Sequence, residues 1–160
     1  MRIHTPSSED VKRFIKESNL IEGITAPVRV KDIDTFLRFV TEDVLTVRCV
    51  EEYVSFIQPN AMLRVGGQNV SVGSHIPPKG GMGIQYALAE LLAKMHEPVG
   101  ITPYDAHCEY ETLHPFTDGN GRSGRALWAW HSLRKGHHHC VKYNFLQEWY
   151  YKSLDKHRSV

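Results

Sequence analysis

Several features that mark other protein classes are missing from this chain of 160 residues. It has no run of eighteen apolar residues, so the sequence predicts no membrane span. Its N-terminus, MRIHTPSSED, lacks the apolar core of a secretory signal. The 19 Lys and Arg residues nearly balance the 18 Asp and Glu residues, which excludes binding to nucleic acid driven by net charge. We therefore expect neither nucleic acid nor a membrane among its partners.

Cysteine is scarce as well. Cys49, Cys108 and Cys140 are odd in number and lie far apart in the sequence. Such a set argues against a disulfide scaffold and for a reducing compartment, so we expect a cytoplasmic location. A chain of this length buries roughly 70% of its unfolded surface, which is enough for one domain to fold without disulfides.

Apolar residues recur at helical spacing along most of the chain. Ser7 followed by Asp10 marks the start of a first helix, Gly23 is a natural stop, and the helix is expected at 7–22. The same spacing predicts six more helices, near 31–46, 47–58, 84–95, 103–113, 122–135 and 145–156. The predicted fold class is therefore all-α.

One stretch has the alternation of a β-strand instead. Leu63, Val65, Val70 and Val72 alternate around the turn residues 66–69, which predicts a short surface hairpin. A lone hairpin is marginally stable. Two interpretations stay open: a connector packed on the helices, or an edge that accepts another chain by strand addition.

The segment from His114 to Arg125, HPFTDGNGRSGR, carries the clearest chemistry. Its Gly-Asn-Gly run opens a helix, so backbone N–H groups can converge on an anion at the helix N-terminus. Arg122 and Arg125 are three residues apart and can serve the same anion. Asp118 is a candidate Mg²⁺ ligand, and His114 is a candidate base. These are the parts that phosphoryl-type transfer needs.

Three other motifs fail on spacing. An EF-hand counted from Asp118 would place Ala129 where its bidentate Glu belongs. A Walker A loop needs Gly-Lys-Ser/Thr, and a zinc helix needs His-Glu-x-x-His; the chain has neither. The run His137–Cys140 lacks a second ligand cluster at zinc spacing and is interpreted as a polar turn. The remaining alternative for the glycine segment is a plain loop before a capped helix.

The segment resembles the signature of Fic-domain (Fic/Doc) proteins, His-x-Phe-x-Asp/Glu-Gly-Asn-Gly-Arg-x-x-Arg, and matches it at every specified position. The resemblance implies a Fic catalytic domain at 31–160, preceded by an N-terminal inhibitory helix segment at 1–30. It also implies that the hairpin region is the family's flap, which docks the target protein. The flap residues singled out are Arg64, Val70, Val72 and His75.

The activity implied by the resemblance is protein adenylyltransferase: AMP passes from ATP to a hydroxyl of a target protein, with Mg²⁺ as cofactor. His114 would deprotonate the hydroxyl, and Asp118 would hold Mg²⁺. The expected phosphate and nucleotide ligands are Gly119, Asn120, Gly121, Arg122 and Arg125, with Tyr150 and Tyr151 near the base. A branch of the family that phosphorylates has Lys where this chain has Gly121, so AMP transfer is favoured.

The first helix resembles the family's inhibitory motif, Ser/Thr-x-x-x-Glu-Gly/Asn. Ser18, Glu22 and Gly23 match it. The resemblance implies a salt bridge from Glu22 to Arg125 that blocks the γ-phosphate; otherwise Glu22 is an ordinary surface residue at a helix end. Members often self-associate, so a homo-oligomer is considered. Two further alternatives stay open: a nucleotide-binding regulatory module without transfer, and a Fic enzyme that uses another nucleotide or phosphocholine or removes AMP.

Overall fold

The computed structural model describes residues 3–142, 154–156 and 158. Within them lie α1 (Ser8–Ile21), α2 (Val30–Thr41), α3 (Val47–Ile57), α4 (Met82–His96), α5 (Pro103–Leu113), α6 (Asn120–Arg134) and the short 3-10 helix η1 (Cys140–Lys142). The all-α fold class is confirmed. Most of the expected helix at 145–156, with Tyr150 and Tyr151, lies outside the described residues. None of the helices in the described ranges is long and apolar enough to cross a bilayer.

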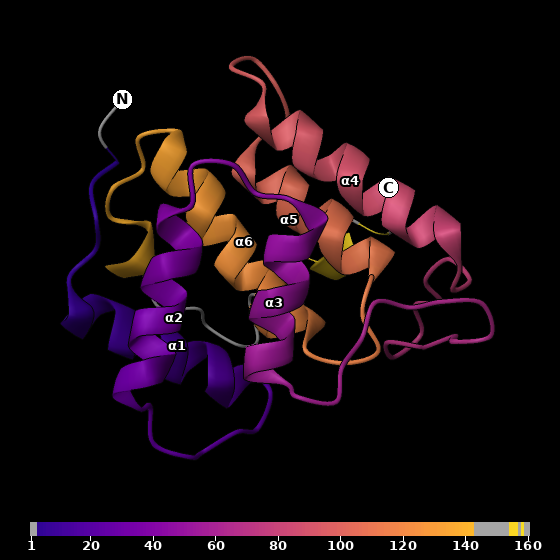
Figure 1. Ribbon diagram of the computed structural model, residues 1–160, viewed down its shortest axis with the longest axis horizontal. Coiled ribbons are helices and arrows are strands. Elements are labelled where there is room, and N and C mark those ends of the chain that lie inside the picture. The colour runs from indigo at the N-terminus through magenta and orange to yellow at the C-terminus, as the bar shows by residue number, and fades with distance from the viewer. Residues whose placement is uncertain (1–2, 143–153, 157, 159–160) are drawn as a thin grey trace.

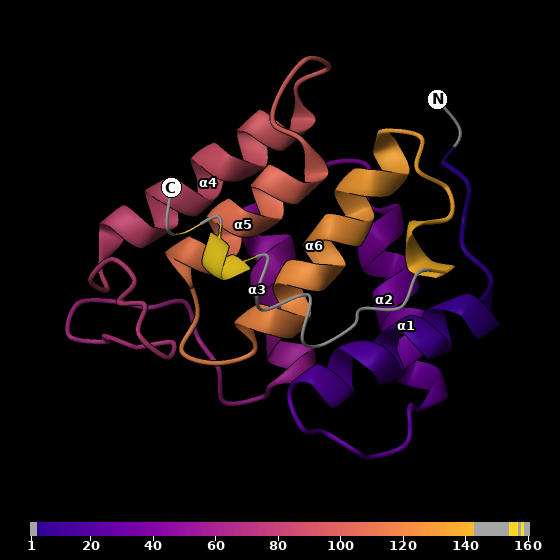
Figure 2. The same cartoon turned by 180° about the vertical axis from the view of Figure 1, so that it is seen from behind.

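Helix α6 lies at the centre of the molecule. It contacts α1, α2, α3 and α5, and α4 packs on α5 (Figure 1 and Figure 2). Most of α6 from Ser123 to Leu133 is buried. Its small residues allow this, because a Cβ atom at Gly124 would lie 2.3 Å from Oε1 of Glu111 on α5. A side chain at position 124 would displace the Glu111 carboxylate and press on Tyr110, so the glycine gives α5 and α6 room to pack closely.

Local capping sets where two helices begin. Ser7 Oγ accepts the Asp10 N–H at 3.2 Å, as its place before α1 predicts. Thr102 Oγ1 accepts the Asp105 N–H at 3.1 Å before α5. Both starts are confirmed, because each depends on residues only three positions apart.

The second helix is shorter than expected, and the prediction of 31–46 is wrong at its C-terminal end. Helix α2 stops at Thr41, and Val44 is 60% exposed. The Glu42 carbonyl is taken by α6, where Trp130 Nε1–H donates to it at 2.8 Å and Arg134 also donates to it. These long-range hydrogen bonds hold the chain out of helical register.

The expected hairpin does not form, and no extended strand occurs in the part of the chain that the structure describes. Leu63 pairs with Phe116 through a single antiparallel bridge, and a second bridge joins Val72 to His75. Residues 64–69 pack instead against residues 80–81, where the chain enters α4. A Cβ at Gly80 would lie 2.2 Å from the Val65 carbonyl, so the backbones of 64–69 and 80–81 are in direct contact.

Candidate functional site

Two residues with left-handed backbone conformations shape the loop between α5 and α6. His114 ends α5 with φ +48° and is the only non-glycine residue with positive φ in the described ranges. Gly119 precedes α6 with φ +78°. Such a conformation is costly for a residue with a side chain and persists where surrounding contacts hold it. The turns place His114 and the N-terminus of α6 at the two ends of one short loop.

The side chain of Asn120 closes this loop. Its Oδ1 accepts the Phe116 N–H at 2.9 Å, and its Nδ2 donates to the Phe116 carbonyl at 2.8 Å. Both residues are buried. Asp118 Oδ1 accepts the Gly119 N–H at 2.7 Å. Because both polar groups of the Asn120 amide bond the Phe116 backbone, Asn120 holds the loop closed from inside, and its direct contact with phosphate stays a prediction.

The imidazole of His114 is half-buried at the end of α5. Burial, followed by the nearby charge of Arg64, lowers the pKa of His114 to about 4. The side chain is therefore neutral at pH 7, and a neutral imidazole can accept a proton.

Arg64 is expected to dock a target, but in the structure its side chain is buried and bonds the protein's own backbone. Its side chain is 1% exposed. Its guanidinium donates to the carbonyls of His114 at 2.7 Å, Pro78 at 2.7 Å and Leu113 at 2.9 Å. Arg64 therefore joins the predicted flap to the C-terminus of α5, and it fixes the backbone of the candidate base.

The other three flap residues lie in the same segment. His75 Nε2 is 2.9 Å from the Thr112 carbonyl on α5. Val72 exchanges two backbone hydrogen bonds with His75, both 2.9 Å, and Val70 is half-buried. Their role in docking a target stays a prediction, and the strand pairing on which we based it is not formed.

Arg122 projects from the first turn of α6 toward the end of α3. Nη1 donates to the Ile57 carbonyl at 2.9 Å, and Nη2 donates to Gln58 Oε1 at 2.7 Å. Burial lowers its pKa, and the charges of Asp118 and Glu22 oppose that effect. Its hydrogen-bond acceptors are neutral, so its positive charge is open to an anion.

Arg125 is fully buried, and α1 supplies its partners. Nε donates to Ser18 Oγ at 2.8 Å, and Nη2 donates to the Ser18 carbonyl at 2.9 Å. Nη2 also forms an ion pair with Glu22 Oε1 at 2.6 Å. The structure thus brings Ser18 and Glu22 together with Arg125, although more than a hundred residues separate them in the sequence.

Gly121 lies directly against the ion pair between Glu22 and Arg125. A Cβ at position 121 would lie 2.1 Å from Glu22 Oε1 and 3.1 Å from Arg125 Nη1. The backbone here is helical, so what the glycine provides is room for the Glu22 carboxylate and not an unusual φ angle. The Glu22 carboxylate therefore rests on the N-terminal turn of α6, where an anion of a ligand would also bind.

One residue of the site carried no sequence signal, and another, His107, was expected to be either a supporting residue or an ordinary surface or core histidine. Gln58 holds Arg122 from a distance of 64 positions along the chain. His107 is buried, and its Nδ1 is 2.9 Å from the Gly124 carbonyl, so it supports the packing of α5 on α6. Within the described ranges, no three His, Cys, Asp or Glu side chains are grouped closely enough to hold a metal. Asp118 is exposed at the loop and remains a candidate ligand.

Comparisons with known proteins agree with this geometry. A family model described as "Fic/DOC family" matches residues 51–131. Among solved structures, a Fic family protein from Desulfovibrio desulfuricans G20 is similar, with a TM-score of 0.68 and 22% identity over 94% of this chain. The chain spans 57% of that protein's length. A search of curated proteins gives no match. Because the family model covers half of its residues, including the whole loop from His114 to Arg125, the chain belongs to the Fic/DOC family.

Proposed function

We propose that this chain is a protein adenylyltransferase, which transfers AMP from ATP to a Ser, Thr or Tyr hydroxyl of a target protein and is inhibited by Glu22. The observation that carries the proposal is the 2.6 Å ion pair between Glu22 and Arg125, at the N-terminal turn of α6. A carboxylate seated there stands in for an anionic group of a ligand. The Fic/DOC family includes proteins with this activity.

His114 is the base in this proposal. It accepts the proton of the target hydroxyl, whose oxygen then attacks the α-phosphorus of ATP. The bond from that phosphorus to the oxygen shared with the β-phosphate breaks, and pyrophosphate leaves with the electron pair. The lowered pKa of His114 keeps the ring neutral near pH 7, so it can accept the proton.

In this proposal, the N-terminus of α6 binds the phosphates of ATP. The first N–H groups of a helix lack acceptors within the helix and attract anions. Arg122 and Arg125 add two positive charges within one turn. Mg²⁺ usually binds through one or two carboxylates together with substrate phosphates, and the exposed Asp118 fits that pattern. A bound Mg²⁺ would neutralise charge on the phosphates.

Inhibition follows from the contacts of Arg125. This side chain is 0% exposed, and Ser18 and Glu22 surround it, so a phosphate can reach it only after Glu22 leaves. Glu22 is 33% exposed and lies at the C-terminal end of α1. It can therefore turn toward solvent without unfolding the helix.

The test is AMP transfer by the Glu22→Gly variant. If the competent state makes up about 1% of the parent protein, freeing it raises the rate up to roughly 100-fold. Radiolabelled ATP or a mass shift of one AMP on the protein or a lysate target measures this. Glu97→Gly is the matched control, because Glu97 is also an exposed glutamate that ends a helix, α4.

The outcomes separate the alternatives. A Glu22→Gly variant that binds ATP but transfers no faster than the parent contradicts the inhibitory role. Nucleotide binding without transfer in either protein favours the regulatory module. Transfer seen only with another nucleoside triphosphate, or with CDP-choline, identifies a different donor.

A further inference from the structure

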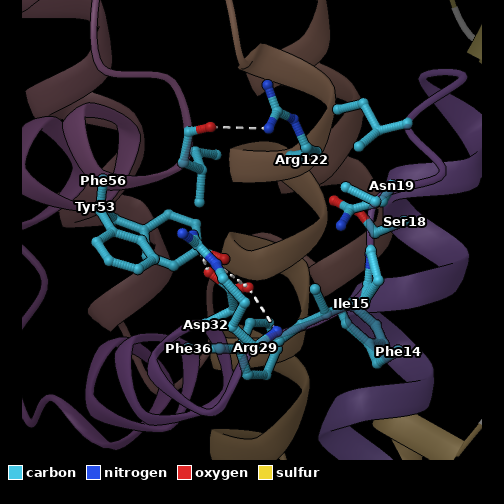
Figure 3. A pocket seen from close by; sticks show the side chains of 14 residues that line it. Phe14, Ile15, Ser18, Asn19, Arg29, Asp32, Phe36, Tyr53, Phe56 and Arg122 are labelled. Carbon is cyan, nitrogen blue, oxygen red and sulfur yellow. Dashed lines mark hydrogen bonds and ion pairs between the residues drawn. The ribbon is translucent and has the colours of Figure 1, made fainter.

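A cavity of about 450 Å³ lies between α1, α2 and α3. The proposed reaction gives its interior no role, although Arg122 and Ser18 of the candidate site are among its lining residues. Its size is within the range of small-molecule sites. Figure 3 shows Tyr53 and Phe56 of α3 on one side and the side chains of α1 on the other. Phe14 and Phe36 complete a set of four aromatic rings. Such walls suit a flat, apolar ligand.

The charged side chains of this cavity do not balance. Two are cations, Arg29 and Arg122, and one is an anion, Asp32. Arg29 and Asp32 pair with each other at 2.6 Å. Arg122 donates to a backbone carbonyl and to Gln58, which are both neutral acceptors. One positive charge is therefore left over among the side chains that line the cavity, and the Asp118 and Glu22 carboxylates act on Arg122 from outside this lining.

Two further residues point to the same ligand chemistry. The Asn19 side chain projects from α1 toward the cavity in Figure 3 and offers an amide donor and acceptor. Burial strongly raises the pKa of Tyr53, and the positive field of Arg122 and Arg125 opposes this rise more than the Asp32 carboxylate adds to it. An occupant with one negative charge gains from this field, whereas a cation loses.

We propose that this cavity binds a small aromatic carboxylate, and that the bound molecule holds α1 against α2 and α3. A monoanion matches the single unbalanced cation, and a planar ring matches the aromatic walls. Phe14, Ile15, Ser18 and Asn19 of α1 form one wall, so the site exists only while α1 is in place. A ligand that binds only this state stabilises it. Its effect on activity rests on the proposed function: it would keep Glu22 on Arg125 and lower AMP transfer.

Binding is tested with three compounds that share one ring system and differ in charge: indole-3-carboxylate, indole and tryptamine. Thermal unfolding of the full chain and isothermal titration measure binding to the protein without nucleotide. We expect the largest increase in Tm with indole-3-carboxylate, a smaller one with indole and none with tryptamine. High salt should weaken binding of the carboxylate more than that of indole.

A pair of variants locates the site. Ala26 lines the cavity, and its neighbour Thr25 does not. Ala26→Phe should fill the cavity and abolish the Tm increase, whereas Thr25→Phe adds the same ring outside and should keep it. Hydrogen exchange of the α1 amides reports on α1 directly. At a ligand concentration of 100 times Kd, exchange that requires α1 to leave should slow by up to about 100-fold.

Neither readout involves nucleotide transfer, so failure here and failure of the proposed function can be told apart. The proposal is overturned if none of the three compounds raises Tm, or if tryptamine binds best. It is also overturned if Ala26→Phe binds like the parent, or if binding leaves α1 exchange unchanged.

Discussion

At the scale of single residues, Arg122 and Arg125 show how one residue type acquires two roles within one helical turn. Arg125 is fully buried and paired with the Glu22 carboxylate. Arg122 is half-buried, and its acceptors are the neutral Ile57 carbonyl and Gln58. Binding of a phosphate at Arg125 must first displace an anion, whereas the hydrogen bonds of Arg122 go to neutral groups and the Asp118 and Glu22 charges act on it only through space. The two substitutions should therefore not be equivalent.

His114 is the first residue for which we predict a change in activity. His114→Ala removes the general base, so AMP transfer should fall by roughly 10²–10⁴-fold. ATP affinity should stay close to that of the parent, because the proposed phosphate ligands are on α6. A transfer assay together with ATP titration checks both parts. Transfer at the parent rate would mean that another group takes the proton.

Gly121 is predicted to depend on Glu22. Gly121→Ala places a Cβ about where Glu22 Oε1 now lies, because the distance between them would be 2.1 Å. The Glu22 carboxylate would have to move aside, so the variant should lose about 1–3 kcal/mol of unfolding free energy because the buried Arg125 loses its ion pair. In a Glu22→Gly background that loss should disappear, since the position is helical and alanine is the better helix former.

Denaturant unfolding of the two single variants and the double variant measures the coupling between positions 121 and 22. Equal effects of Gly121→Ala in both backgrounds would show that the carboxylate does not rest on this glycine.

At the scale of elements, the segment at 62–81 is held by contacts other than strand pairing. Arg64 is its centre, with a buried guanidinium that donates to backbone carbonyls of α5 and of the segment itself. Each buried carbonyl left without a donor costs about 1–3 kcal/mol. Loss of the Arg64 hydrogen bonds should therefore destabilise both the segment at 62–81 and the C-terminal end of α5.

Arg64→Met keeps much of the side-chain volume and removes these donors. We predict a loss of about 1–3 kcal/mol in unfolding free energy, because several partly buried carbonyls lose a donor. Arg38→Met, at an exposed position on α2, is the control. Urea unfolding followed by circular dichroism gives both values. If Arg64→Met is as stable as the control, these hydrogen bonds contribute little.

At the scale of the whole molecule, the packing buries histidines in neutral form. Burial lowers the pKa of His107 to about 3 and that of His131 to about 4. His131 is 0% exposed, and neither ring nitrogen has a hydrogen-bond partner within the described part of the chain. These side chains stay neutral in the folded protein at pH values where unfolded histidine, with a pKa near 6.5, takes up a proton.

Stability should therefore fall as the solution is acidified. Below about pH 6.5 the unfolded chain binds more protons than the folded one, and the difference persists until about pH 4, near the folded pKa of His131. Each such histidine removes up to about 1.4 kcal/mol per pH unit in this window. His131→Phe should flatten the dependence of Tm on pH between 6.5 and 4, and His139→Gln, at an exposed position, is the control.

The chemistry of the loop and the positions of most helices could be predicted because both depend on neighbouring residues. The caps at Ser7 and Thr102 act over three positions. The run from His114 to Arg125 brings its base, its glycines and its arginines within twelve consecutive residues. Such local patterns favour their backbone conformation through interactions between neighbouring residues.

The tertiary structure determined which distant residues contact the loop and the helix ends. Contacts between distant parts of the chain determine where α2 ends and why the expected hairpin does not form. Such a contact also joins Gln58 to Arg122. The resemblance to the Fic family implied the pairing of Glu22 with Arg125, but only the packing of α1 on α6 placed the carboxylate over Gly121. The cavity behind α1 also has walls from three helices. No pattern within one segment specifies such a surface, because its shape depends on how the helices pack.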